Sequence, residues 1–344
     1  MARPSAHNTA QAPDAPHAPA MRYKATFLHA GRLLLDGGGM FGLIPRVVWS
    51  RSVPTDERNR IELAHNCILL ESLAPDPELG RPRRVLIEAG TGDKLDPKMA
   101  DVFGLDGRTI ETALAEKNVA PESIDSVIVS HLHFDHAGGL TRRVRPGETP
   151  DWTASAPLDR SGDADAVKLT FPNAEVIVQE REWLDAIAND SVMTRTYYRD
   201  HLEPLRPRLR LVDSQRPFPI GLRPHRDELP RIPLEQRTTR VLPGIFVFLV
   251  PGHTWGQQAI LFHDEHGAPH VFTPDVMPTA WHSGSAYSLA YDVEPYTSMV
   301  SRHWLLREAS ERAWTLVLDH EPRTPRVRVR ANDKHWFDLT PVDA

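Results

Sequence analysis

The stretch SHLHFDHAGG concentrates histidine beyond what composition explains. The chain has 17 histidines in 344 residues, yet three fall within six positions here, with an aspartate among them. His131 and His133 follow the apolar run DSVIVS, and alternate residues of an extended chain point the same way. Asp135 and His136 come next, where we expect the chain to turn into a helix at Ala137. Imidazole and carboxylate are the ligands zinc takes when no thiolate is present, so the spacing predicts a metal-binding hook.

Three more polar residues each follow an apolar, strand-like run. His253 follows GIFVFLVPG, Asp275 follows HVFTP, and His320 follows WTLVLD. Loops at strand ends often carry function, although each of these residues taken alone could equally be a cap or a turn residue. The hook and three strand-end residues in one chain favour a shared metal site.

Apolar patterning and turn residues predict the elements that must position these side chains. Strands are expected at YKATFLHAGRLLLDGG, RIELAHNCILLES, RRVLIEAG, DSVIVS, AEVIVQ, GIFVFLVPG, QQAILFHD, APHVFTPD and WTLVLDHEP. Helices are expected near residues 106–117, at EREWLDAIA and at YTSMVSRHWLLREASERA. Hairpin-like strands with interspersed helices fit two sheets faced by helices better than a regular alternating parallel sheet.

Composition separates a short tail from one large domain. Residues 1–21 are rich in Ala and Pro and lack the apolar segment of a secretory signal, so we expect a disordered tail. Residues 22–344 are expected to form a single domain. Two stretches near 144–170 and 214–240, rich in Pro, Arg, Asp and Ser, are expected to be surface insertions.

Charge and cysteine content exclude several classes of protein. The net charge is −6, which gives no reason to expect a nucleic-acid partner. No apolar run is long enough to cross a bilayer, so no membrane partner is expected and the default location is cytoplasmic. Cys67, the one cysteine, excludes an intrachain disulfide and is expected to be a core thiol.

HLHFDHAGG resembles the HxHxDH signature of the metallo-β-lactamase fold superfamily. PGHTWGQQ, TPDVMP and LDHEP resemble its later ligand motifs, in the family's order, and the resemblance covers about residues 23–335. It implies an α+β fold, a four-layer αββα sandwich with the metal site at one edge of the two sheets.

The resemblance also implies two divalent metal ions, with zinc the first choice and manganese, iron or cobalt as alternatives. One ion would be held by His131, His133 and His253, the other by Asp135, His136 and His320, and Asp275 would bridge them. The family usually has Asp-Thr-Gly where this chain has Glu88-Ala89-Gly90. Glu88 is therefore expected to support the site from behind.

LLLDGGGMFGLIPRVVWSR and DERNRIELAHNCILLES are similar to a subgroup that includes N-acyl-homoserine lactonases and methyl parathion hydrolase-like enzymes. This implies a hydrolase in which a metal-bridging hydroxide attacks a lactone or ester carbonyl, in a quorum-quenching role. Asp135 would pass a proton to the leaving alkoxide. His282 would donate to the oxyanion or orient the substrate, unless it is a structural histidine.

An apolar acyl pocket is predicted from five residues, with core packing as the alternative for them: Met40, Phe41, Leu43, Trp49 and Trp281. The expected partners are a small-molecule substrate and, as family members often are, a second copy in a homodimer.

Other functions remain open on the same site. A phosphotriesterase, an arylesterase or a β-lactam hydrolase would use the same hydroxide. A binding protein that had lost catalysis would be expected to lack a ligand, and none is missing. A mononuclear iron dioxygenase is disfavoured, because Asp135, His136 and His320 would then be present without full use. A nuclease is disfavoured too, because it would be expected to have a basic surface or an added domain.

Overall fold

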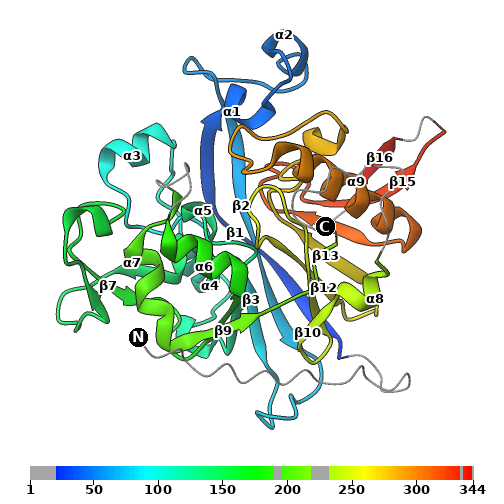
Figure 1. The fold of residues 1–344 in the computed structure, drawn as a ribbon. Coiled ribbons are helices and arrows are strands. Elements are labelled where there is room, and N and C mark those ends of the chain that lie inside the picture. Colours follow the sequence, from blue (N-terminus) through cyan, green and yellow to red (C-terminus); the bar gives the residue numbers. More distant parts are fainter. Residues whose placement is uncertain (1–20, 190–195, 218–231, 334–335, 343–344) are drawn as a thin grey trace.

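The computed structural model describes residues 21–189, 196–217, 232–333 and 336–342 (Figure 1). The predicted tail lies outside these ranges except for its last residue, and so do residues 218–231 of the second predicted insertion.

Strands and short helices alternate along the chain. The strands are β1 (Tyr23–Asp36), β2 (Arg60–Ser72), β3 (Arg84–Ile87), β4 (Ser126–Ile128), β5 (Thr141–Arg143), β6 (Trp152–Thr153), β7 (Ala166–Leu169), β8 (Glu175–Gln179), β9 (Leu209–Val212), β10 (Thr239–Leu242), β11 (Ile245–Leu249), β12 (Gln258–His263), β13 (Pro269–Thr273), β14 (Thr315–Leu318), β15 (Arg326–Ala331) and β16 (Phe337–Pro341). The α-helices are α1 (Gly37–Phe41), α2 (Arg46–Trp49), α3 (Pro97–Val102), α4 (Ile110–Ala115), α5 (Phe134–Ala137), α6 (Glu180–Ala188), α7 (Arg199–Leu202), α8 (Leu234–Arg237) and α9 (Pro295–Glu311). Short 3₁₀ helices lie at Pro121–Ser123, Gly138–Leu140, Pro157–Asp159, Glu203–Arg208 and Ala280–Ser283.

Two large sheets form the body of the described chain. The first has the order β1-β2-β3-β4-β8-β9, antiparallel from β1 to β3 and parallel from β3 to β9. The second has the order β10-β11-β12-β13-β14-β15-β16 and is antiparallel except where β13 and β14 run parallel. The predicted pairing of GIFVFLVPG with QQAILFHD is confirmed as β11 and β12.

Alternation along the strands explains the stacking of the layers. Leu69 and Val127 contact the helical layer outside the first sheet, whereas Ile68 and Ile128 contact the second sheet. Successive strand residues point to opposite faces, and both faces here are buried, which is why these strands read as continuous apolar runs. Cys67, on the helix-facing side of β2, is the buried core thiol that the sequence predicts.

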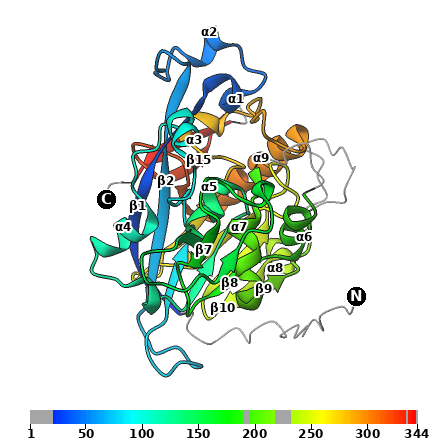
Figure 2. The same ribbon diagram turned by 90° about the vertical axis from the view of Figure 1, so that its left-hand side faces the viewer.

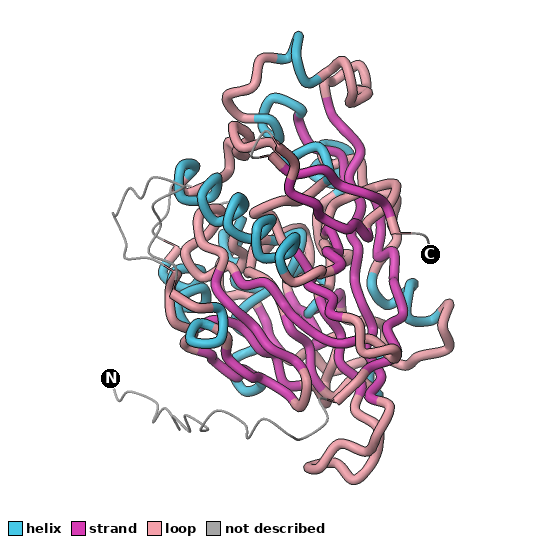
Figure 3. Tube along the Cα trace, turned by 90° about the vertical axis from the view of Figure 1, so that its right-hand side faces the viewer, coloured by secondary structure: helices cyan, strands magenta, loops and turns pink. Residues whose placement is uncertain are grey.

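Helix α9 forms the fourth layer over the outer face of the second sheet (Figure 3). Its Trp304 and Leu305 pack with Phe248 of β11 and Leu316 of β14. The predicted α+β four-layer sandwich is therefore confirmed. Within the described residues, no helix is both long and apolar enough to cross a membrane.

An arm projects beyond the body at one end of β1 and β2 (Figures 1 and 2). It carries α1 and α2, and it packs on its own small apolar cluster, which includes Leu33, Met40, Phe41 and Trp49. The arm brings the glycine-rich stretch DGGGMFG close to the same end of the sandwich as the strand ends that carry the predicted ligands.

Two of the predicted helices differ from the structure in where they begin or end. The helix after the histidine hook begins at Phe134 rather than at Ala137, so Asp135 and His136 lie inside α5. Helix α4 is shorter than residues 106–117, because Thr109 caps its start by accepting a hydrogen bond from the backbone N–H of Thr112.

Residues 144–170 contain more regular structure than expected. Strands β6 and β7 lie in this segment, and β7 pairs with both β5 and β6 in a three-stranded antiparallel sheet. Strands of two to four residues are too short for alternation to reveal them.

Candidate metal centre

Strand register brings the predicted ligands together at one edge of the sandwich. In the parallel pair β13 and β14, Thr273 lies opposite Leu318. Asp275 and His320 are each two residues beyond that pair, so both emerge at the same edge. The hook follows β4 of the other sheet, and the two sheets are fastened there by Gln258, which donates to the carbonyl oxygen of Val129 at 2.8 Å through its side chain.

The first cluster joins His131, His133, His253 and Asp275. Nδ1 of His133 lies 3.1 Å from Nε2 of His131 and 2.9 Å from Nε2 of His253. A neutral imidazole nitrogen carries either one proton or one lone pair, so His133 Nδ1 cannot satisfy both neighbours. Asp275 Oδ2 completes the group at 3.1 Å from Nε2 of His253.

The second cluster joins His136, Asp275, Asp319 and His320. Asp275 belongs to both clusters through different oxygens. Its Oδ1 lies 3.2 Å from His320 Nε2, while its Oδ2 faces His253 and lies 3.7 Å from His136 Nε2. This is the arrangement expected of a carboxylate between two cations.

Asp135, the remaining predicted ligand, lies beside the second cluster. Its carboxylate oxygens are 3.8 Å from His136 Nε2 and 3.7 Å from His320 Nε2. All seven predicted ligands therefore meet within one buried region, each with at most a small exposed fraction.

Most of the histidines are held through the nitrogen that faces away from the cluster. His131 Nδ1 lies 3.0 Å from Ser130 Oγ, and His253 Nδ1 lies 3.0 Å from Asp292 Oδ1. His320 Nδ1 donates to the carbonyl oxygen of Ala64 at 2.8 Å. Such outer contacts fix the ring orientation and leave Nε2 free to bind a metal.

Glu88 contacts His136 on the side of the ring that faces away from Asp275. Its Oε2 lies 3.2 Å from His136 Nδ1, and its Oε1 accepts the backbone N–H of Ser130 at 2.6 Å. Glu88 adopts φ 68°, a left-handed conformation that is uncommon for a residue other than glycine. The backbone strain and the longer side chain together let one carboxylate reach both the strand end and α5.

The donor set fits divalent cations. Nε2 of His136, Nε2 of His320 and Oδ1 of Asp275 are buried and make no hydrogen bond within the described residues. A buried polar atom without a partner is costly, and a bound ion would satisfy all three. Imidazole nitrogens with carboxylate oxygens are the ligand types of a zinc-class site.

The carboxylates of the site also favour positive charge at two of the histidines. Burial disfavours the protonated form of His253 and of His320, yet neighbouring carboxylates outweigh burial. Asp275 and then Asp292 raise the pKa of His253 to about 9, and Asp319 and then Asp275 raise the pKa of His320 to about 10. Carboxylates therefore favour positive charge at His253 and His320, whereas burial and the neighbouring histidines lower the pKa of His131 and of His133.

The sequence did not reveal several carboxylates at this centre. Asp319 precedes His320, and its Oδ2 lies 3.0 Å from His136 Nδ1. Asp292 holds His253 from a segment 39 residues away along the chain. The one signal available for Asp319 was its position beside a predicted ligand, and the loop that carries Asp292 had none.

His282 lies next to the centre with both ring nitrogens engaged. Its Nδ1 is 2.8 Å from Thr279 Oγ1, its Nε2 is 2.8 Å from the carbonyl oxygen of Met40, and its ring stacks on Phe41. Burial lowers the pKa of His282 to about 4, so the ring is neutral. These contacts describe a structural role, and the predicted catalytic role stays a prediction.

Four of the five predicted pocket residues belong to the apolar cluster of the arm or pack against it, and Leu43 does not. Met40, Phe41 and Trp49 are buried in the arm cluster, where they pack on one another. Leu43 is 80% exposed at the arm, and Trp281 is partly buried with Arg323 over its ring. Packing accounts for the first three, and the acyl-pocket role stays a prediction.

Comparison with known proteins identifies the family. A model of the metallo-β-lactamase superfamily matches residues 60–320, and the chain belongs to this superfamily. Family, fold and the His/Asp clusters together support a metal-dependent hydrolase. A search of curated proteins gives no match.

Several solved structures share the fold over nearly the whole chain. A probable metal-dependent hydrolase from Staphylococcus aureus is 24% identical, with a TM-score of 0.71 over 95% of this chain and 99% of that one. The dizinc quorum-quenching lactonase AidC, in complex with the product N-hexanoyl-L-homoserine, is 15% identical, with a TM-score of 0.64 over 94% and 99%. A quorum-quenching N-acyl homoserine lactone lactonase is 19% identical, with a TM-score of 0.55 over 88% and 95%.

Proposed function

We propose that the chain is a dinuclear-metal hydrolase that opens the ring of a lactone of the N-acyl-homoserine type or cleaves a similar ester. The observation that carries the proposal is Asp275, whose two oxygens face two separate groups of histidine nitrogens at 3.1 Å and 3.2 Å. The shared fold with structures described as quorum-quenching lactonases supports the choice of substrate class.

Two ions would be held by the residues already described. His131, His133 and His253 would bind the first, His136 and His320 would bind the second with Asp135, and Asp275 would contact both. When bound, such ions supply a water of lowered pKa and polarise a carbonyl oxygen. Zinc is the first choice, because every donor is an imidazole or a carboxylate.

The protein's own groups would orient the reaction. Asp292 and Glu88 accept from Nδ1 of His253 and His136, which fixes the tautomer of these rings, and Ser130 orients the ring of His131. Asp135 lies on α5 at the edge of the second cluster, from which its carboxyl would carry a proton to the leaving oxygen of the substrate.

The first experiment measures metal content by elemental analysis, together with hydrolysis of a long-chain N-acyl-homoserine lactone. Two metals per chain with lactone turnover is the expected result. Two metals without lactone turnover would indicate that the substrate is a phosphotriester or an aryl ester instead. One metal or none after zinc supplementation would contradict the dinuclear site.

Substitutions then test the ligands. His253→Ala and Asp275→Ala are each expected to lose metal and at least a hundredfold in activity while the protein keeps its far-UV circular dichroism. His266→Ala is the matched control, because this histidine is exposed in the turn between β12 and β13. Full activity in both ligand variants would overturn the assignment.

A further inference from the structure

The loop of residues 276–291 connects two carboxylates that contact the same histidine. Asp275, which precedes the loop, has its Oδ2 3.1 Å from His253 Nε2. Asp292, which follows it, has its Oδ1 3.0 Å from His253 Nδ1. The position of this loop therefore affects both nitrogens of one predicted ligand and, through Asp275, both clusters.

The buried guanidinium of Arg302, on α9, binds this loop at three carbonyl oxygens. Its Nη1 donates to the carbonyl oxygen of Val276 at 3.3 Å. Its Nη2 donates to the carbonyl oxygen of Gly284 at 3.2 Å and to that of Tyr287. Val276 directly follows Asp275, so one of the three bonds holds the peptide next to the carboxylate that both clusters share.

Arg302 carries a charge that no carboxylate pairs with among the described residues, since all its acceptors there are backbone carbonyl oxygens. Burial lowers the pKa of Arg302 to about 10, although the charge of Asp292 opposes that effect. A buried charge without a counter-ion costs stability, so packing alone would favour an apolar side chain here. A planar fork of five donors reaches several carbonyl oxygens at once, which suits an arginine to fixing a loop.

The N-terminal part of α9 also holds the loop that carries His253. Ser301 Oγ donates to the carbonyl oxygen of Pro251 at 2.6 Å, and the backbone N–H of Glu294 donates to the carbonyl oxygen of Gly252 at 2.8 Å. A Cβ atom at Gly252 would lie 2.2 Å from the backbone nitrogen of Ser298. The His253 loop and the 276–291 loop are therefore both fixed on the same helix.

We infer that Arg302 is a positioning residue that holds Asp275 against His253 and thereby sets the affinity for both metal ions. The inference rests on the dinuclear centre of the proposed function and is independent of the substrate. Arg302 touches none of the metal-facing atoms and acts through the backbone of the 276–291 loop. Because Asp275 belongs to both clusters, loss of Arg302 is expected to weaken the binding of both ions together.

Two substitutions of Arg302 test this role. Arg302→Lys keeps the positive charge, but a lysine ammonium cannot span the three carbonyl oxygens as a planar fork does. Arg302→Ala removes the guanidinium and leaves a space that free guanidinium ion can refill at concentrations far below those that unfold proteins. Zinc affinity of the full chain is measured by chelator competition, with and without added guanidinium.

Both variants are expected to lose about tenfold or more in zinc affinity, with the two ions released in a single step. Guanidinium is expected to restore the affinity of Arg302→Ala. Arg307→Ala is the matched control, because this arginine is exposed on the same helix and pairs with Glu311. Wild-type affinity and no response to guanidinium are expected for the control.

A merely structural arginine gives a different pattern. Its loss would lower the thermal midpoints of metal-depleted and zinc-loaded protein equally and leave zinc affinity unchanged. This pattern in Arg302→Lys would overturn the inference, and so would a folded Arg302→Ala whose zinc affinity guanidinium does not restore. If Arg302→Ala does not fold, Arg302→Lys decides.

Failure of this inference can be distinguished from failure of the proposed function. A wild type that binds two ions but hydrolyses no lactone, aryl ester or phosphotriester would overturn the proposed function, while the zinc titrations would still decide the role of Arg302. A wild type that binds fewer than two ions after zinc supplementation would overturn both.

Discussion

Lys94 is a fully buried lysine behind the ligand-bearing turn. Its ammonium donates to the carbonyl oxygens of Gly138 and Thr141, just after α5. Burial lowers the pKa of Lys94 from 10.5 to about 8, although the nearby carboxylates of Asp200 and Asp93 oppose that effect. The charges that face it also include Arg143 and Glu111. A buried charge therefore supports the backbone that carries Asp135 and His136, at a cost in stability.

This cost predicts a pH-dependent stability. Below about pH 8, Lys94 is charged in both the folded and the unfolded states, and the full penalty of burial applies. Between about pH 8 and 10.5 the unfolded chain binds the proton and the folded protein does not, so the folded state gains stability as the pH rises. The gain from this group is about 3 kcal/mol at most.

Thermal midpoints of metal-depleted protein at pH 7.5 and pH 10 measure this gain in stability from Lys94. The midpoint of the wild type minus that of Lys94→Met is expected to grow with pH, because the pH-independent loss of two hydrogen bonds cancels in the comparison. Lys98→Met, at an exposed lysine of α3, is the control and is expected to show no such trend. A difference that stays constant for Lys94→Met would contradict the prediction.

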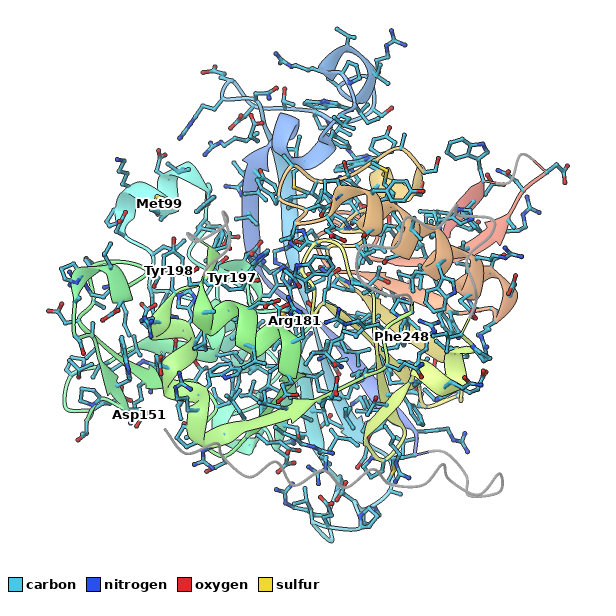
Figure 4. All side chains as sticks on the ribbon, in the orientation of Figure 1. Met99, Asp151, Arg181, Tyr197, Tyr198 and Phe248 are labelled. Atoms are coloured by element: carbon cyan, nitrogen blue, oxygen red, sulfur yellow. The ribbon has the colours of Figure 1, made fainter. Side chains whose placement is uncertain are left out.

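At the scale of elements, the first turn of α6 joins the two loops that hold the first cluster. Glu182 Oε1 accepts the backbone N–H of Leu132 at 3.0 Å, and Oε2 accepts the hydroxyl of Thr254 at 2.6 Å. Tyr197 also donates to Oε1, at 3.3 Å, and lies near the centre of the molecule in Figure 4. A Cβ atom at Gly256 would lie 2.3 Å from the backbone nitrogen of Glu182, so the loop that carries His253 packs directly on α6.

This arrangement makes Glu182 a positioning residue for the first ion. Glu182→Gln and Thr254→Val are each expected to lower the affinity for the first ion by about 10- to 100-fold. The reason is that the loops of His131, His133 and His253 lose their common support. Chelator competition measures the affinity, and the stoichiometry is expected to fall toward one metal per chain before the second ion is lost. Glu180→Gln, an exposed glutamate of the same turn, is the control. Unchanged binding of both ions in both variants would contradict this role.

At the scale of the whole molecule, the centre lies where the two sheets meet. The hook follows β4 of the first sheet, and the other ligands follow β11, β13 and β14 of the second. Asn66 of β2 also reaches across, donating from Nδ2 to the carbonyl oxygens of Leu318 and Glu321 at 2.9 Å each. Bound ions would therefore cross-link the sheets.

Metal removal is expected to lower the thermal midpoint of the whole protein. Ions that bind only the folded state stabilise it by about 4 kcal/mol at a thousandfold excess over the dissociation constant. Scanning calorimetry before and after chelation measures the change, and Asp275→Ala is expected to show little of it. An identical midpoint for wild-type protein with and without metal would contradict the cross-link.

The sequence by itself determined the strands and the ligand types. Short apolar runs bounded by turn residues predicted the main strands, because a strand buried on both faces reads as a continuous apolar segment. The spacing of His131 and His133 predicted two converging rings, because two residues of a nearly extended backbone set their directions. These are local properties, which the backbone geometry of a few residues decides.

The tertiary structure alone decided which other groups join the centre. Asp292 contacts His253, and Glu182 contacts the loops that carry the first cluster, from segments far away along the chain that no local spacing marks. Likewise, only the packed structure shows that Gly39 of DGGGMFG lies against the hydroxyl of Tyr291. Such neighbours depend on how two sheets and an arm pack together, and that packing is a sum over many distant contacts rather than a property of any one segment.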